Sequence, residues 1–100
     1  MKIVRTIVWD VEAESYLESA IKFIRKDSPQ NAETVKGKIL DSISDLISTP
    51  EKHPLDKYHH NKKGLYRAFE IYRFRIAYSA SETEIKIIRI RHTSQEPLDY

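Results

Sequence analysis

Cysteine is absent from this chain of 100 residues, so the sequence offers neither a disulfide framework nor a thiolate metal site. A chain without cysteine suits a reducing compartment, and we expect a cytoplasmic protein. Long apolar runs are also missing, which argues against a membrane-spanning helix. The first residues lack the apolar stretch and the small-residue cleavage site of a signal peptide. These absences argue against secreted disulfide-rich domains and membrane proteins.

What the chain has is an ordinary globular composition with an uneven charge. Hydrophobic residues make up 40% and charged residues 32%, which suits one domain over residues 1–100 with one core. The net charge of +2 divides into −1 for residues 1–50 and +3 for residues 51–100, and it rises to +6 over residues 52–92. The positive charge therefore belongs to the second half, and it is compatible with an anionic partner such as RNA, DNA or an acidic protein segment.

Hydrophobic periodicity predicts the order strand, two helices, loop and three strands. Residues 2–9 are β-branched and mostly apolar, which indicates a strand buried on both faces. Apolar residues recur at three- and four-residue spacing over residues 11–26 and 29–48, which predicts two amphipathic helices. Asp10 is the expected N-cap of the first helix, and Ser28 followed by Pro29 is the expected start of the second. So short a connection predicts an antiparallel helical hairpin.

The core is expected where the helices meet the sheet. Short turns join the last three strands, over residues 65–69, 72–78 and 85–92, so they should form an antiparallel meander. The expected fold class is α+β, with a strand, an antiparallel helical hairpin and a three-stranded antiparallel meander (β-α-α-β-β-β). The helix residues expected to pack on the sheet, opposite its arginine face, are Leu17, Phe23, Ile24, Val35, Ile39 and Ile43.

Arginine repeats along the predicted sheet. In the middle strand, apolar and aromatic side chains alternate with Arg73 and Arg75, and alternation with period two is typical of a half-buried strand. Five arginines occur in this region: Arg67, Arg73, Arg75, Arg89 and Arg91. On a shared solvent face, their guanidinium groups would form a fixed plane suited to phosphate or carboxylate. An ordinary solvated sheet face is equally compatible with the pattern.

The loop predicted between the second helix and the meander, residues 49–64, is polar and carries three of the four histidines. His59 and His60 are adjacent and lack the spacing of a helical metal pair, so exposure in a loop is preferred over a metal site. We expect no metal and no other cofactor. A loop of this length is more often functional or disordered than a simple connection between elements.

Several short elements occur in an order and at a spacing that are specific in combination. They are the aromatic end of the first strand, Ser28-Pro29, the helix end from Leu46 to Pro50, Tyr66-Arg67, Arg75-Ile76-Ala77-Tyr78 and Ile88-Arg89-Ile90-Arg91-His92. In these features nearly the whole chain resembles the RelE/ParE superfamily, the toxins of bacterial type II toxin–antitoxin pairs. The resemblance implies a helical hairpin packed on a twisted antiparallel sheet. It also implies a cognate antitoxin whose C-terminal segment wraps the toxin and neutralises it.

This superfamily divides in function. RelE-like toxins cut messenger RNA in the ribosome by helping a ribose 2′-hydroxyl attack the adjacent phosphate, which needs a base, cations for the developing charge and an acid. ParE-like toxins share the fold but are taken to poison DNA gyrase. Arg67 falls where RelE-like toxins place a catalytic arginine, and His92 falls near a histidine that some relatives use as acid or base. With Arg75 and Tyr100, these are the candidate catalytic residues of a ribonuclease, whereas Glu70 is expected to be solvated at a turn.

Two features resemble the ParE-like branch more closely. The tail after His92 lacks the basic residue that RelE-like members tend to place there, and the long helical hairpin with its Ser-Pro connection resembles ParE relatives. We therefore prefer shared family architecture for Arg67 and a strand-end cap for His92 over catalysis. The predicted function is a growth-inhibiting, plasmid-stabilising toxin that binds DNA gyrase. The alternatives are a ribosome-dependent mRNA endoribonuclease and a degenerate module that only binds its antitoxin.

The cognate antitoxin is expected to bind in a groove between apolar side chains of the helices, by strand addition to a sheet edge, or by both. The candidate groove residues, those that the sheet leaves uncovered, are Tyr16, Ala20, Leu40 and Leu46. Acidic antitoxin side chains are expected to meet some of the five arginines of the sheet. A toxin–antitoxin heterotetramer is a further expectation for the assembly.

Overall fold

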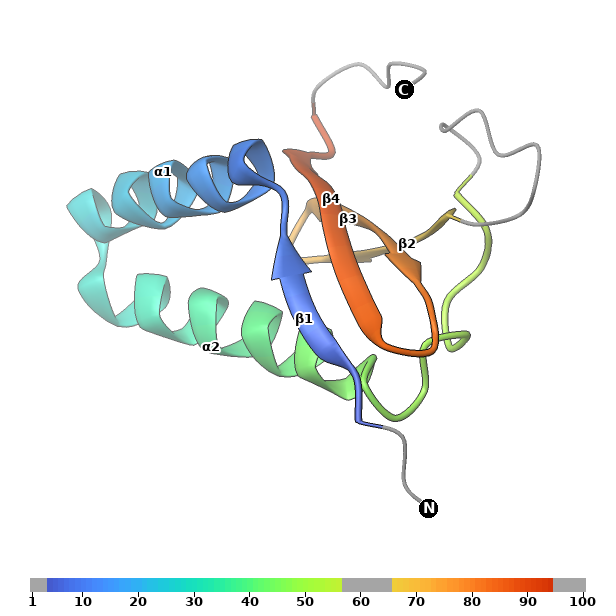
Figure 1. The fold of residues 1–100 in the computed structure, drawn as a ribbon. Coiled ribbons are helices and arrows are strands. Elements are labelled where there is room, and N and C mark those ends of the chain that lie inside the picture. Colours follow the sequence, from blue (N-terminus) through green and yellow to red (C-terminus); the bar gives the residue numbers. More distant parts are fainter. Residues whose placement is uncertain (1–3, 57–65, 95–100) are drawn as a thin grey trace.

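The computed structural model describes residues 4–56 and 66–94 of the chain. Its elements follow the order β1 (Thr6–Trp9), α1 (Val11–Asp27), α2 (Pro29–Asp45), β2 (Tyr66–Ile71), β3 (Phe74–Ala80) and β4 (Glu84–His92) (Figure 1). One sheet has the strand order β1-β4-β3-β2, in which β1 runs parallel to β4 and the other neighbours are antiparallel. The predicted α+β fold, with a helical hairpin and a three-stranded meander, is confirmed.

Capping side chains fix where the helices begin and end. Asp10 accepts a hydrogen bond from the backbone N–H of Glu12 at 2.9 Å and so starts α1. Ser28 serves both helices, because its own N–H donates to the carbonyl of Ile24 at 3.0 Å while its hydroxyl accepts from the N–H of Asn31 at 3.2 Å. A single residue between the helices forces the second to turn back along the first, as predicted.

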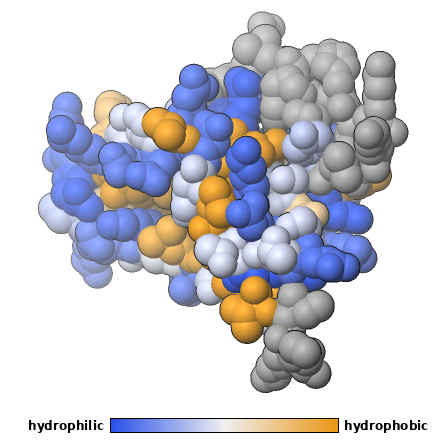
Figure 2. Space-filling view, in the orientation of Figure 1, coloured by the Kyte–Doolittle hydropathy of each residue, from blue (hydrophilic) through white to orange (hydrophobic). Residues whose placement is uncertain are grey.

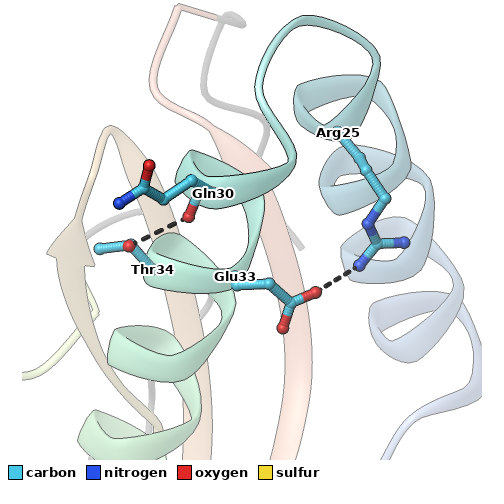
Figure 3. A network of polar contacts seen from close by, with 4 residues as sticks. All are labelled: Arg25, Gln30, Glu33 and Thr34. Carbon is cyan, nitrogen blue, oxygen red and sulfur yellow. Dashed lines mark hydrogen bonds and ion pairs between the residues drawn. The ribbon is translucent and has the colours of Figure 1, made fainter.

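Figure 3 shows two polar contacts of the helical hairpin, one between the two helices and one within α2. Arg25 of α1 donates to the carboxylate of Glu33 of α2 at 2.9 Å. Within α2, the hydroxyl of Thr34 donates to the carbonyl of Gln30, one turn earlier, at 3.1 Å. Both side chains of the ion pair are largely exposed, so this pair contributes little to stability.

The hydrophobic core lies between the helical hairpin and one face of the sheet. Its fully buried members come from α1, from α2 and its C-cap, and from the last three strands: Ala13, Leu17, Ile21, Ala32, Ile39, Ile43, Leu46, Phe69, Phe74, Ile76, Tyr78, Ile85, Ile87 and Ile90. On the side shown in Figure 2, hydrophilic residues dominate the outer surface of the hairpin and hydrophobic residues form separate patches. Neither helix in the described part of the chain is long and apolar enough to span a membrane.

The predicted helix phase is right for Leu17, Ile39 and Ile43, which are buried, but wrong for Phe23, which is 70% exposed. The buried side chains of α1 are Ala13, Leu17 and Ile21, spaced by four residues. Phe23 follows Ile21 by two positions, or about 200° around the helix, so it lies outside the core. Ile24 and Val35 are partly buried at the edge of the core.

The N-terminal strand differs from the prediction of a strand buried on both faces. β1 pairs only with β4, so it forms one edge of the sheet, and Ile7, Val8 and Trp9 are only partly buried. A high content of β-branched residues indicates a strand but cannot distinguish a central strand from an edge strand that packs under a helical hairpin.

The turn between β2 and β3 also lies elsewhere than predicted. Tyr72 and Arg73 were assigned to the middle strand, but they form a two-residue turn in which both residues have positive φ, 49° and 66°. Two positive φ values are the signature of a type I′ hairpin turn, which glycine and asparagine usually occupy. The turn is closed further by the N–H of Thr93, which donates to the carbonyl of Arg73 at 2.7 Å. Glu70, expected at the turn, lies inside β2 opposite Arg75.

Replacing Ile39 with alanine tests the helix phase. Ile39 is 0% exposed, so we expect the lost methyl groups and the cavity left behind to lower the unfolding free energy by roughly 2–5 kcal/mol. Leu40→Ala is the matched control, because Leu40 is the next residue and is 40% exposed. Urea unfolding of the three proteins measures the difference. Equal losses in the two variants would contradict the assigned phase.

Candidate functional site

The segment that follows α2 packs along the free edge of β2. The N–H of Ala68 donates to the carbonyl of Pro54 at 3.1 Å, and the N–H of Asp56 donates to the carbonyl of Tyr66 at 3.0 Å. Leu55 forms an antiparallel bridge with Arg67 between these two bonds. Residues 54–56 of the predicted loop therefore pair with the edge of the sheet. Residues 57–65, with the basic residues expected there, lie outside the described part of the chain.

Strand register sorts the five arginines into three positions and contradicts a single plane. Residues directly opposite each other on paired strands share a face. Arg75 lies opposite Arg91, and Ala77 lies opposite Arg89, so Arg75, Arg89 and Arg91 share the sheet face away from the helices. Arg67 lies opposite Tyr78 and is therefore on the other face, next to the core. Arg73 is exposed in the turn.

The arginines on the outer face are not an open cationic surface. Arg91 is only 5% exposed. Arg75 donates to the carboxylate of Asp56 at 2.8 Å, and the side chains of this pair are 12% and 0% exposed. Glu70 lies 3.9 Å from the other end of the same guanidinium. Arg75 therefore balances a buried carboxylate, and its charge is largely committed to the fold.

On the other face, Arg67 holds the backbone of the same segment. Its guanidinium donates to the carbonyl of His53 at 2.8 Å. The imidazole of His53 stacks on Phe69 with a centroid distance of 4.4 Å, and the ring of Tyr78 meets it edge-on at 6.3 Å. The Tyr78 hydroxyl donates to the carbonyl of Pro50 at 2.7 Å. Arginine, histidine and tyrosine together anchor residues 50–56 against the core.

Asp56 and His53 attach this segment to the sheet, through Arg75 and Phe69 respectively, but the sequence analysis does not predict either contact. One signal for Asp56 is available there, because it is the only acidic residue between Lys52 and Gly64. An isolated carboxylate in a basic segment is a candidate partner for a nearby arginine. His53 offers no comparable signal, because its stacking partner Phe69 is sixteen positions away and is brought close only by the fold.

His92 lies at the other end of the sheet from Arg67. It is opposite Phe74, whereas Arg67 is opposite Tyr78, four residues further along β3, a separation of about 13 Å along the strand. The backbone N–H of His92 donates to the hydroxyl of Tyr16 at 2.8 Å, and its Nδ1 is 2.7 Å from the hydroxyl of Ser94. Arg75 is on the opposite face, so these three candidate residues are not brought together. Tyr100 lies outside the described residues.

An open groove of about 460 Å³ lies between α1 and the β2–β3 turn. Its lining residues are Tyr16, Ser19, Ala20, Phe23, Ile24, Tyr72, Phe74 and His92. Two of the four predicted groove residues, Tyr16 and Ala20, therefore line one groove. Leu40 is 40% exposed on α2 but does not line it, and Leu46 is fully buried, so Leu46 is not available to a partner. Among the described residues, no three histidine, aspartate or glutamate side chains are placed to hold a metal ion.

Removing the Asp56 carboxylate tests the buried ion pair. Asp56→Leu leaves the Arg75 guanidinium without its buried partner and should lower the unfolding free energy by roughly 3–5 kcal/mol, whereas adding Arg75→Met should recover much of that loss. The exposed pair gives the control, because Glu33→Leu with or without Arg25→Met should change stability by less than about 1 kcal/mol. An uncoupled, additive double-mutant cycle at Asp56 and Arg75 would contradict this role.

His53 should make the stability of the protein depend on pH. Burial, and to a lesser extent the charge of Lys52, lowers the pKa of His53 below its ordinary value of 6.5. The folded protein then holds His53 neutral at pH values where the unfolded chain protonates it. Its contribution to stability is therefore complete above pH 6.5 and is lost as the pH falls through the lowered pKa.

The variant His53→Phe keeps the stack on Phe69 but cannot be protonated. Between about pH 7.5 and about pH 5, the parent protein should lose more unfolding free energy than this variant. Urea unfolding across this range measures both curves, and the difference between them cancels the contributions of other titrating groups. Parallel curves would show that His53 is not held neutral by its surroundings.

Comparisons with known proteins identify the relatives of this chain. The family model of the ParE toxin of the type II toxin–antitoxin system, parDE, matches residues 7–97. A solved structure of the chromosomal ParDE TA system from P. aeruginosa has the same fold, with a TM-score of 0.67 and 16% sequence identity over 91% of this chain and 98% of that chain. Among curated proteins, no sequence matches significantly. Since the family model covers nearly the whole chain, the protein belongs to the ParE family of toxins of type II toxin–antitoxin systems.

Proposed function

We propose that this ParE-family toxin inhibits growth by binding DNA gyrase and that a cognate antitoxin neutralises it. The observation that carries the choice of mechanism is the separation of Arg67, Arg75 and His92, which lie on two faces and at two ends of the sheet. Cleavage of RNA by attack of a 2′-hydroxyl needs a base, an acid and a cation around one phosphate. Their separation therefore supports a mechanism by protein binding over one by RNA cleavage.

The contacts and burial of the arginines also support gyrase binding over RNA cleavage. Arg75 neutralises Asp56, Arg91 is buried, and Arg67 donates to a backbone carbonyl. These three side chains therefore have structural roles that do not require RNA. Arg73 is the most available of the five arginines, because it is exposed at the tip of the β2–β3 hairpin. We therefore assign Arg73 the leading anionic contact with gyrase or the antitoxin, with Arg67, Arg75 and Arg89 in partial support.

The groove beside α1 is the proposed antitoxin site. Apolar side chains line most of it, and the exposed rings of Phe23 and Tyr72 flank it, 70% and 48% accessible. An amphipathic antitoxin segment can bury its apolar side chains against Tyr16, Ala20 and Phe23 while an acidic residue meets Arg73. We include a heterotetramer of two toxins and two antitoxins in this proposal. Native mass spectrometry of the purified complex measures the stoichiometry.

Induction of the toxin in growing cells tests the mechanism. We expect growth arrest with inhibited supercoiling, blocked DNA re-ligation and intact transcripts. His92→Gln and Tyr100→Phe should leave toxicity nearly unchanged, because neither side chain transfers a proton in this mechanism. Loss of a general acid or base would instead lower cleavage by roughly two to four orders of magnitude.

Assays with the purified protein distinguish gyrase inhibition from mRNA cleavage directly. The parent protein should inhibit gyrase in a supercoiling assay and should not cleave mRNA on ribosomes. The unfolding midpoint of His92→Gln shows whether that variant is folded. Transcript cleavage by the parent, together with loss of toxicity in a folded His92→Gln variant, would establish the ribonuclease and refute the proposal. A protein that binds its antitoxin but arrests nothing would be the degenerate module.

A further inference from the structure

A second pocket lies at the end of the sheet away from the groove. It has a volume of about 310 Å³ and is lined by Arg5, Pro50, Glu51, Arg67 and the residues of the β3–β4 turn, Ala80, Ser81 and Glu82. The groove beside α1 includes Phe74, at the start of β3, whereas this pocket includes Ala80, at its end. The two cavities therefore occupy opposite ends of the same strand.

Backbone carbonyls hold both guanidinium groups of this pocket in place. Arg5 Nε donates to the carbonyl of Ser81 at 2.8 Å, and Arg5 Nη1 donates to the carbonyl of Ile47 at 3.1 Å. Arg67 Nη1 donates to the carbonyl of His53 at 2.8 Å. These contacts connect the start of the chain, the end of α2, the segment after it and the β3–β4 turn. They fix the orientation of each guanidinium without neutralising its charge.

Neither Arg5 nor Arg67 forms an ion pair with a carboxylate in residues 4–56 and 66–94. The ion pairs in that part of the chain include Arg25 with Glu33, and Arg75 with Asp56 and Glu70, but neither Arg5 nor Arg67. A guanidinium has five N–H donors in a rigid fork, and each of these two commits only one or two of them to the protein. Two oriented cations with unused donors in one pocket form a site for an oxyanion.

The other charges of the pocket select among oxyanions. Glu51 and Glu82 also line it, and both are exposed. Two carboxylates beside two guanidinium groups leave no net charge, which disfavours a stretch of nucleic acid with its run of phosphates. A single carboxylate still gains bidentate hydrogen bonds from a guanidinium fork, whose planar geometry it matches. The composition therefore favours an acidic side chain of a protein over a nucleic-acid backbone.

We propose that Arg5 and Arg67 form a carboxylate-binding site for an acidic segment of a protein partner. The site does not depend on the groove beside α1 or on the identity of the toxin's target. It gives the protein a polar attachment point at the end of the sheet opposite the apolar one. A partner that reaches both would be fixed by apolar burial at one end and by charge at the other.

Binding of a defined acidic probe to the full-length protein tests the site. The probe is an acetylated, amidated peptide of four glutamates, and the comparison is a single-stranded oligothymidylate of equal charge. At low salt, nuclear magnetic resonance follows the Nε–H signals of the arginines during titration. We expect the peptide to move the signals of Arg5 and Arg67 saturably and to bind more tightly than the oligonucleotide. Tighter binding of the oligonucleotide at these two arginines would overturn the proposal in favour of a nucleic-acid site.

Variants separate this site from general attraction to a basic protein. Arg5→Gln and Arg67→Gln should each weaken peptide binding by about tenfold or more, in line with the loss of a charge-assisted hydrogen bond. Arg25→Gln is the matched control, because Arg25 already pairs with Glu33, and it should leave the affinity unchanged. An equal loss in Arg25→Gln and Arg67→Gln would show that only overall charge matters, and the proposal would fail.

A second set of variants guards against unfolding, because Arg67 also holds residues 50–56. Glu51→Gln and Glu82→Gln keep both anchored arginines and remove a competing carboxylate from the lining. Each should raise the affinity for the peptide by about twofold to tenfold. Unchanged affinity in both would mean that the peptide does not occupy this pocket.

Discussion

The attachment of the segment after α2 to the sheet is the contact on which the edge of the sheet and the pocket at Arg67 depend. A buried carboxylate costs several kcal/mol unless a cation meets it with good geometry. Arg75 meets the buried Asp56 carboxylate at 2.8 Å, and the pair fixes the segment on the outer face of the sheet. His53 and Pro50 fix it on the inner face, where Phe69, Tyr78 and Arg67 receive them. The segment thus wraps around the edge of β2, where Leu55 pairs with Arg67 and covers part of an edge that would otherwise be open to other chains.

This wrapping changes what the basic character of the second half means. A basic balance and repeated arginines on a strand resemble a surface for a polyanion. In the folded chain, Arg75 and Arg91 are largely buried, and Arg67 holds a backbone carbonyl. Arg73 is exposed at one end of the sheet, and at the other end Arg5 and Arg67 line a pocket while each donates only one or two of its N–H groups to the protein. Among the described residues, these two positions lie at opposite ends of the sheet.

Local signals in the sequence were sufficient for the elements and insufficient for the sites. Asp10, Ser28 and Pro29 mark helix ends by chemistry that acts within a few residues, so the hairpin was predictable. The family resemblance was carried by such short elements too, and the match of a ParE family model confirms it. The prediction that Phe23 is buried is wrong because the assumed helix phase left out Ile21, which is buried in the structure.

The remaining differences come from long-range pairing, which a pattern of alternating residues does not specify. Moving the hairpin turn to Tyr72 and Arg73 decides which residues oppose each other, and it places Arg67 on the core face. The register shift between Ala77 and Tyr78 then sets Arg89 rather than Ile88 opposite Ala77. Neither the position of this turn nor the register shift can be recognised from the composition or the periodicity of the sequence. The partners of Arg75 and Arg67, Asp56 and His53, likewise come from a segment that joins the sheet only in the folded chain.

The turn at Tyr72 and Arg73 shows that the hairpin is not built for maximal stability. Glycine or asparagine adopts positive φ with less strain than either residue found there. The chain instead accepts backbone strain at two large side chains, of which Tyr72 lines the groove and Arg73 is exposed. A redesign for stability would begin by replacing this dipeptide, and it would remove an aromatic side chain that lines the groove. At this position, an unstrained backbone and large exposed side chains make opposite demands on the same two residues.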